Sequence, residues 1–190
     1  VTLQGVQLRN AAFWTALLGG ADIRVHGVSI RSPDWLEAPN TDGIDIAARR
    51  VHIANVDITN GDDSIAIKSP SADVLVERSV VRQGNGLVVG TAGSGLVGDD
   101  PDLASVTNVT FRNITAIDTT FGCHVKYRWP QHGTVRSIVF ENIHIMQTAE
   151  ATDRRVKGGD WAGYALGIHQ SDQGMRWDQG MRWDQGMRWD

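Results

Sequence analysis

The sequence predicts an all-β fold, a right-handed parallel β-helix, from two observations. The pattern apolar–x–apolar–x–Gly/Asn–apolar–x–apolar recurs six times along the 190 residues, and a further short apolar run follows each copy. Three short strands in each repeat of roughly 25 residues are typical of a solenoid with parallel coils, and parallel crossovers are right-handed. Helical patterns are nearly absent. A β-sandwich is the alternative, but its strands would not resemble one another so closely.

The fifth position of the repeat predicts a bend between two strands. Alternating apolar residues flank this position on both sides, and Gly and Asn tolerate the left-handed backbone angles that a bend needs. Successive bends are 22, 28, 23, 35 and 29 residues apart. The predicted bend residues are Gly5, Gly27, Asn55, Arg78, Asn113 and Asn142.

The third strand of each coil is predicted in the apolar run after each repeat. These runs are FWTALL from Phe13, GIDIA from Gly43, SIAIK from Ser64, GLVVG from Gly86, CHVKY from Cys123 and YALGI from Tyr164. The β-helix domain is therefore expected over residues 1–172. Residues 173–190 are three copies of Gln-Gly-Met-Arg-Trp-Asp, whose period of six does not fit a coil. We expect this segment to be a low-complexity tail that forms no coil.

Composition excludes several classes of partner. The net charge is -4 with both signs interspersed, which argues against nucleic acid. No apolar run reaches the ~18 residues of a membrane span. The chain begins at Val1 in a strand-like pattern, without a signal peptide or targeting segment. The histidines show no metal-ligand spacing, so no metal is expected, and we expect a monomer in which the single Cys123 is a buried structural thiol.

Polar residues recur just before, or on, the third strand of successive coils. Asp62 and Asp63 lie seven and eight residues past the bend at Asn55, and Asn85 lies seven past Arg78. Because equivalent positions of adjacent coils stack about 4.8 Å apart, these side chains should be neighbours. The predicted ladder on one face comprises Asp42, Asp62, Asp63, Asn85, His124 and Lys126.

Carboxylates that converge in this way have the chemistry of glycoside hydrolysis. One acid must stay protonated for the leaving oxygen, while another must stay ionised to activate water. Crowding separates the two states, because neighbouring negative charges raise one pKa and leave the other groups ionised. Turn chemistry alone, which Asn60-Gly61-Asp62 also satisfies, does not explain the lysine beside these carboxylates.

Four motifs resemble those of glycoside hydrolase family 28, the pectin-degrading polygalacturonases and their relatives. They are NTDGID from Asn40, NGDDSIAIKS from Asn60, GNG from Gly84 and HVK from His124, in this order. The resemblance implies a pectin-lyase-like β-helix, extracellular enzymes that invert the anomeric centre without a cofactor, and a chain truncated at both ends.

By the same resemblance, Asp62 is the general acid, and Asp42 and Asp63 hold and activate the water. Lys126 would bind a substrate carboxylate, with Asn85 and His124 beside it. Two motifs differ from the family. Asn85 stands where the family usually has a histidine, and His124 stands where it usually has an arginine, which removes a bidentate partner for carboxylates.

Two further functions remain open on the sequence. A β-helix polysaccharide lyase would need calcium held by the aspartates and a basic residue as proton abstractor. A catalytically impaired relative would bind carbohydrate without turnover. Outside the ladder, Asp45 is expected to be a structural hydrogen-bonding residue and Lys68 to be solvated, while Trp14 could either stack on a sugar or pack against the coils.

Overall fold

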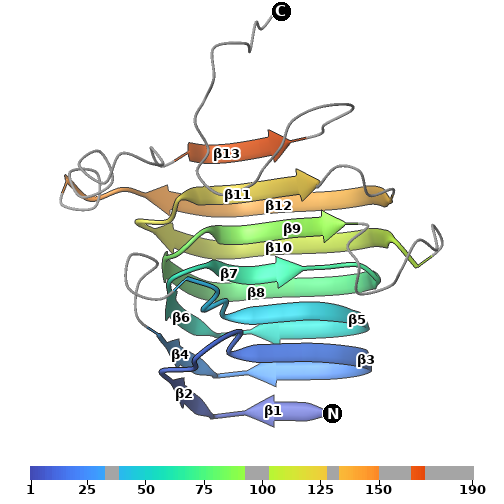
Figure 1. Ribbon diagram of the computed structural model, residues 1–190, viewed down its shortest axis with the longest axis horizontal. Coiled ribbons are helices and arrows are strands. Elements are labelled where there is room, and N and C mark those ends of the chain that lie inside the picture. The colour runs from blue at the N-terminus through green and yellow to red at the C-terminus, as the bar shows by residue number, and fades with distance from the viewer. Residues whose placement is uncertain (33–38, 93–102, 128–132, 150–163, 170–190) are drawn as a thin grey trace, which may run out of the picture.

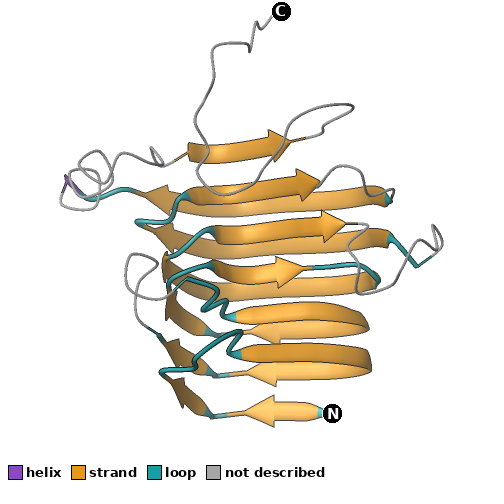
Figure 2. Ribbon diagram, in the orientation of Figure 1, coloured by secondary structure: helices purple, strands orange, loops and turns teal. Residues whose placement is uncertain are grey.

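A computed structural model describes residues 1–32, 39–92, 103–127, 133–149 and 164–169. Within these residues the chain forms parallel strands that wind upward coil by coil (Figure 1) and no helix of even one full turn (Figure 2). The predicted right-handed parallel β-helix is confirmed. The strands are β1 (Thr2–Gln4), β2 (Gln7–Arg9), β3 (Ala16–His26), β4 (Ser29–Arg31), β5 (Ile44–Ala54), β6 (Asp57–Asn60), β7 (Asp63–Ile67), β8 (Ser71–Gln83), β9 (Gly86–Ala92), β10 (Ser105–Ile117), β11 (Phe121–Tyr127), β12 (Thr134–Met146) and β13 (Tyr164–His169).

The register between coils equals the spacing of the sequence repeat. Val51 of β5 pairs with Val74 of β8, which pairs with Val109 of β10, which in turn pairs with Ile138 of β12. These residues occupy the same position of successive repeats, so the intervals between the predicted bends were already the lengths of the coils. On the face that will carry the site, β7, β9, β11 and β13 pair in that order.

The predicted bends are confirmed, and three of the six, at Gly5, Gly27 and Asn55, separate two strands as expected. All six bend residues have φ between 50° and 65°. However, β8, β10 and β12 continue through Arg78, Asn113 and Asn142, so these coils contain two strands rather than three. The ladder continues because adjacent coils bend at the same position, which keeps their hydrogen-bonding groups opposite one another.

The core is a column of inward-facing aliphatic side chains, one layer from each coil. Ile30, Ile46, Ile58 and Ile67 are fully buried. In the later coils one position of the core becomes aromatic, where Phe111 and Phe140 follow Val76. Phe111, also fully buried, stacks on Phe140 with ring centroids 5.2 Å apart and planes 4° apart. Stacking of like residues in register therefore follows directly from the repeat.

A buried carboxylate, Glu77 on β8, anchors the face formed by β5, β8 and β10. Its side chain is 4% exposed and accepts hydrogen bonds from Arg112 Nε at 2.8 Å and His52 Nε2 at 2.9 Å, with Arg78 as a further ion-pair partner. Burial alone would raise the pKa of Glu77, but the hydrogen bonds from Arg112, His52 and Arg78 outweigh it and hold this pKa at about 2.

Glu77 should therefore make stability depend on acid pH. Its folded pKa lies below the ordinary 4.5, so the stabilisation is complete above about 4.5 and is lost as pH falls toward about 2. We expect Glu77→Gln to flatten the decline of the free energy of unfolding over this range, measured by urea denaturation at several pH values. Glu141→Gln, at an exposed position of β12, is the control and should retain the wild-type decline.

The expected domain boundary at residue 172 and the expected tail over residues 173–190 lie outside the described residues. Both stay predictions.

The single cysteine has the expected structural character. Cys123 is buried, and burial raises the pKa of its thiol to about 11, as expected of a structural cysteine. Among the described residues, no helix has the length and apolar character needed to cross a membrane.

Candidate active site

Consecutive coils bring five of the six predicted ladder residues together: four lie at the amino-terminal ends of their strands, and Lys126 reaches them from near the carboxyl end of β11. Asp42 precedes β5, Asp62 and Asp63 stand at the entry to β7, and Asn85 precedes β9. Backbone bonds tie these entries together: Gly43 N–H donates to Asp63 O at 2.9 Å, and Asn85 N–H donates to Asp62 O at 2.7 Å. The predicted stacking of Asn85 on Asp62 is thus confirmed.

A buried asparagine that sequence reasoning assigned only to a turn organises this entry. The Asn60 amide donates to the carbonyl oxygens of Thr41, Asp62 and Asp63 at 3.0, 2.8 and 3.0 Å. Gly61 N–H donates to Thr41 Oγ1 at 3.0 Å. Asn60 therefore joins the Asp42 coil to the Asp62 coil. The Asn-Gly-Asp sequence was the available signal, but it indicates a turn without saying what the amide contacts.

Gly84 explains why the next turn can lie so close to Asp62. Its φ is +53°, and a Cβ built on it would overlap the Asp62 carbonyl oxygen. A side chain at this position would push Asn85 away from the aspartates. The Gly-Asn-Gly motif is therefore needed for close approach of two backbones.

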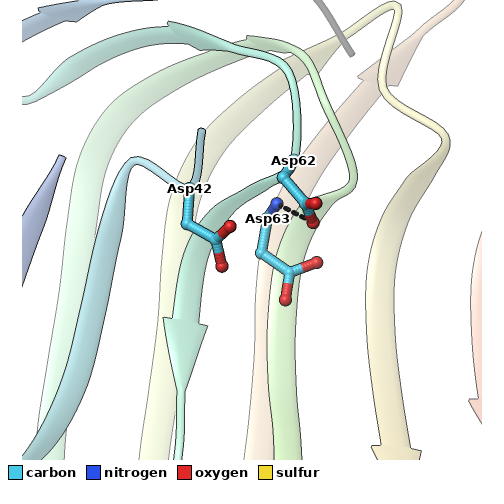
Figure 3. Close-up of side chains that lie close together, drawn as sticks. All are labelled: Asp42, Asp62 and Asp63. Carbon is cyan, nitrogen blue, oxygen red and sulfur yellow. Dashed lines mark hydrogen bonds between the residues drawn. The ribbon is translucent and has the colours of Figure 1, made fainter. Parts of the chain in front are cut away.

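The three aspartates converge tightly (Figure 3). One carboxylate oxygen from each of Asp42, Asp62 and Asp63 lies within 4.8 Å of the other two. Asp62 Oδ1 accepts a hydrogen bond from Asp63 N–H at 2.8 Å, and Asp62 Oδ2 accepts one from Asn40 N–H at 3.1 Å. Asp62 is thereby held at the rim of the trio, while Asp42 and Asp63 are 3% and 1% exposed.

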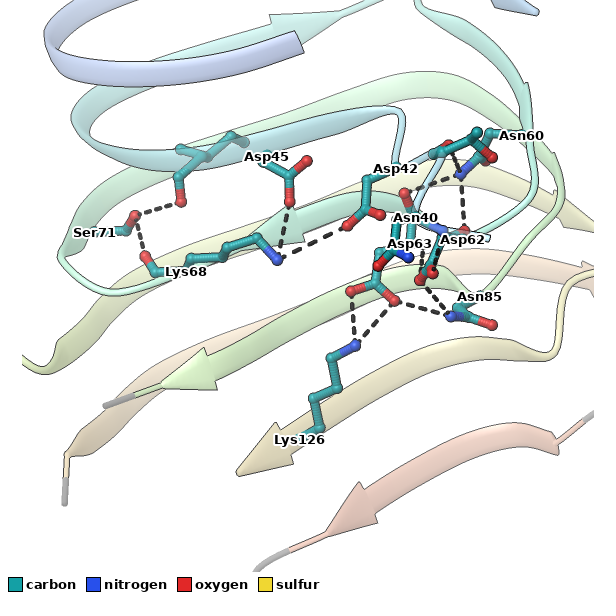
Figure 4. A network of polar contacts seen from close by, with 12 residues as sticks. Asn40, Asp42, Asp45, Asn60, Asp62, Asp63, Lys68, Ser71, Asn85 and Lys126 are labelled. Carbon is teal, nitrogen blue, oxygen red and sulfur yellow. Dashed lines mark hydrogen bonds and ion pairs between the residues drawn. The ribbon is translucent and has the colours of Figure 1, made fainter. Parts of the chain in front are cut away.

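Asn85 and Lys126 complete the cluster from the next two coils (Figure 4). Asn85 Nδ2 donates to Asp62 Oδ1 at 2.9 Å and to Asp63 Oδ1 at 3.1 Å. Lys126 Nζ donates to both oxygens of Asp63, at 3.0 and 2.7 Å. The amide therefore bridges two carboxylates, and the ammonium neutralises one of them.

These contacts separate the pKa values of the three aspartates. Burial alone would raise the pKa of Asp63, but Lys126, with help from Lys68, more than offsets it and holds this pKa below the ordinary value. Burial and then the negative charge of Asp63 raise the pKa of Asp62. Burial, followed by the charges of Asp63, Asp45 and Asp62, raises the pKa of Asp42 to about 9. At neutral pH, Asp63 is therefore ionised and Asp42 is protonated.

The expectation that Lys68 is solvated is wrong. Its side chain is 10% exposed, and Nζ lies 2.9 Å from Asp45 Oδ1, 3.8 Å from Asp42 Oδ2 and 4.5 Å from the centre of the Trp14 ring. Lys68 directly follows β7, and residues of preceding coils cover its side chain there. Trp14 packs over this lysine and stacks on Phe13.

His124 lies in the ladder but differs from its neighbours. It pairs in register with Val88 of β9, on the same face as Lys126. Its side chain is 5% exposed, and its ring stacks on Phe121 with centroids 4.0 Å apart. A contact between His124 and a substrate stays a prediction.

The sequence profile of glycosyl hydrolases family 28 matches residues 1–152. The chain belongs to this family. Among family 28 relatives, a probable exopolygalacturonase C of Aspergillus terreus is 34% identical over 146 residues, which cover 76% of this chain and 33% of that protein. A polygalacturonase of Cryptomeria japonica is 29% identical over 148 residues, covering 77% and 27% of the two chains. The chain thus spans about a third of the length of the curated relatives it matches.

A solved structure has the same fold. The endo-xylogalacturonan hydrolase from Aspergillus tubingensis superimposes with a TM-score of 0.66 at 23% identity. The match covers 88% of this chain and 49% of that enzyme.

Proposed function

We propose that this chain carries the catalytic centre of an inverting, polygalacturonase-type hydrolase of galacturonic-acid-containing polysaccharide. The observation that carries the proposal is the convergence of Asp42, Asp62 and Asp63 within 4.8 Å, where burial and neighbouring charges raise the pKa of Asp42 and Asp62 and lysine holds the pKa of Asp63 down. Membership in family 28, and relatives named polygalacturonases, support the substrate class. An extracellular location, action as a monomer and independence of any cofactor belong to the same proposal.

The protonation states assign a role to each aspartate. Asp62, at the rim and with a raised pKa, donates its proton to the glycosidic oxygen. Asp63, held ionised by Lys126, accepts a proton from the attacking water. Asp42 is protonated at neutral pH, so it orients this water instead of serving as the base. The expected shared activation by Asp42 and Asp63 is thereby divided between them.

The water fits between Asp42 and Asp63. Two hydrogen bonds of about 2.8 Å from one water span about 4.6 Å at a tetrahedral angle, and the nearest oxygens of this trio are within 4.8 Å. Inverting pairs usually stand about 6.5–9.5 Å apart, with the water between acid and base. The aspartates here are closer together than such a pair, so the water of this proposal lies beside the acid, under the sugar ring.

Substrate binding is proposed to use the two partners of the trio that remain accessible. Lys126 is 30% exposed, so its ammonium can neutralise a galacturonate carboxylate as well as Asp63. Asn85 is half-buried and can offer its amide oxygen to a sugar hydroxyl. His124 is included as predicted from the sequence. Without the arginine usual in the family, an acidic sugar meets one point charge here.

The decisive experiment is incubation with polygalacturonate and with a neutral xylan, followed by a reducing-end assay with and without chelator. The proposal expects new reducing ends from polygalacturonate alone, unaffected by chelator. A lyase would instead require calcium and give an unsaturated product that absorbs ultraviolet light. Binding measured by calorimetry without any product would identify a carbohydrate-binding relative. No observation favours either alternative over hydrolysis.

The pKa directions predict the pH profile of kcat at saturating substrate. Asp62 must be protonated, and because its pKa is raised, activity should persist above the ordinary aspartate value of about 3.9 and fall as pH rises through the Asp62 pKa. Asp63 must be ionised, and because its pKa is lowered, the acid limb should lie below that value. A single limb, or an acid limb above pH ~5, would contradict these roles.

A further inference from the structure

A second carboxylate–lysine pair lies directly behind the trio. Asp45, on β5, is fully buried, and Lys68 Nζ lies 2.9 Å from its Oδ1. The same ammonium is 3.8 Å from Asp42 Oδ2. Figure 4 shows the lysine extending from beyond β7 toward both carboxylates. Asp42, which orients the water in the proposed mechanism, therefore has the Lys68–Asp45 ion pair beside it.

The backbone fixes where this lysine can reach. Lys68 N–H donates to Ile46 O at 2.7 Å, and Ser71 Oγ donates to Lys68 O at 2.6 Å. Asp45 pairs in register with Ala66 of the next coil. The Trp14 ring, from an earlier coil, covers the ammonium, and its centre lies 4.5 Å from Lys68 Nζ. A buried lysine clamped in this way has little freedom to serve solvent or substrate.

The charges of the site assign one ammonium to each ionised carboxylate. Lys126 is paired with Asp63, and Lys68 is closer to Asp45 than to Asp42. Both Asp45 oxygens are buried, and neither has a hydrogen-bond partner of good geometry among the described residues. Burial raises the pKa of Asp45, but the adjacent Lys68 ammonium opposes this shift, whereas burial and the neighbouring carboxylates raise the pKa of Asp42 to about 9. We therefore assign the proton to Asp42, which can donate it to an Asp45 oxygen that otherwise lacks a donor.

We propose that the Lys68–Asp45 ion pair positions the attacking water by holding the Asp42 hydroxyl proton toward Asp45. The inference rests on the proposed hydrolytic function and concerns residues that act through Asp42, without touching substrate. With its proton turned away, Asp42 presents only an acceptor oxygen to the water. If the proton pointed toward the water, it would occupy one of the water's two lone pairs and make the water a weaker nucleophile.

The resulting step balances. The water donates one hydrogen bond to Asp42 and one to Asp63, which leaves a lone pair free to face the anomeric carbon. The new C–O bond forms from this lone pair while the glycosidic C–O bond breaks. The proton that the water loses goes to Asp63, and the leaving oxygen takes the proton of Asp62.

Carbon-13 NMR of aspartate carboxyl groups tests the placement of the proton independently of catalysis. The signals are assigned with Asp42→Asn and Asp45→Asn. At pH 7 we expect Asp42 at the protonated shift and Asp45 at the ionised shift. Lys68→Met should move the Asp45 signal to the protonated position, because its counter-ion is gone. An ionised Asp42 in the wild type, or an Asp45 signal unaffected by Lys68→Met, would overturn the inference.

Kinetics test the consequence with folded variants. Replacing a buried ion pair by apolar residues of similar size is often neutral for stability, so Asp45→Leu/Lys68→Met should fold. It should lose about 10- to 100-fold in kcat, the scale of misplacing a reacting group, with KM little changed. Asp45→Asn/Lys68→Met keeps an acceptor oxygen for the Asp42 proton and should recover most of this loss.

The controls separate this inference from the proposed function. Arg50→Gln breaks the exposed ion pair with Asp22 and should leave kcat and KM unchanged. Equal kcat in the wild type and in Asp45→Leu/Lys68→Met would refute the positioning role while leaving hydrolysis intact. If the wild type hydrolyses no pectic substrate, the proposed function fails, and the NMR shifts still decide whether the ion pair orients the Asp42 proton.

Discussion

Asp62→Asn should lower kcat on polygalacturonate at least about a hundredfold, the usual contribution of a general acid. Asn keeps the size of the side chain, and its single oxygen can still accept one of the two hydrogen bonds, from Asn40 N–H or from Asp63 N–H, that Asp62 accepts on different oxygens. It has no proton to give to the leaving oxygen. The rate is measured at saturating substrate, so that altered binding does not enter, and the KM should change far less than kcat.

Asp22→Asn is the matched control, because Asp22 is an exposed carboxylate paired with Arg50 away from the trio. It should have the wild-type rate. An Asp62→Asn rate within about tenfold of the wild type would move the acid role to another group. The anomeric configuration of the first product, followed by NMR, tests the same step: inversion is expected, whereas retention would require a covalent intermediate on an aspartate.

Phe111→Ala should reduce the free energy of unfolding by about 3–5 kcal/mol, the range for a fully buried phenylalanine. The ring is 0% exposed and stacks at 5.2 Å on Phe140 of the following coil. Its loss leaves a cavity between two coils that are held in register by the β10–β12 ladder, so the strands cannot collapse to fill it. Chemical denaturation followed by circular dichroism measures the change.

Phe13→Ala provides the comparison at constant chemistry. Phe13 is 56% exposed, so its removal should cost no more than about 0.5 kcal/mol, as at most surface positions. Equal losses at the two sites would mean that the column of side chains is not the main source of stability in this fold.

The fold could be predicted from the sequence because the sequence pattern repeats. The bends at Gly5 and Asn55 mark the same position of different coils, and the intervals between such bends gave the register in which β5, β8, β10 and β12 pair. The same register placed Asn85 on Asp62 without any reference to a family. Local patterns did not predict that a strand can continue through a bend. Alternation is broken at Arg78, yet β8 continues through this residue because the coils on both sides bend at the same position.

The site was harder to predict from the sequence, for a physical reason that Lys68 illustrates. Period-two alternation tells which face of a strand a side chain occupies, but not what the neighbouring coils place over that face. Asp45 comes from the coil before and Trp14 from the one before that, and together they turn an apparently solvated lysine into a buried counter-ion. The protonation of Asp42 was equally hidden, since it depends on burial and on three carboxylates that only folding brings together.

The strict coil-on-coil pairing also determines how the molecule opens. In a linear array each repeat is supported only by its immediate neighbours, so fluctuations begin at edge strands and spread inward. Within the described residues, β2 and β13 are each paired on one side, whereas β7 lies between β5 and β9. Amide hydrogens of β7 should therefore exchange with solvent more slowly than those of the edges. The aspartates lie at the strand entries of central coils, which open less often than the edge coils. The aspartate cluster can therefore keep its geometry while the outer coils open transiently.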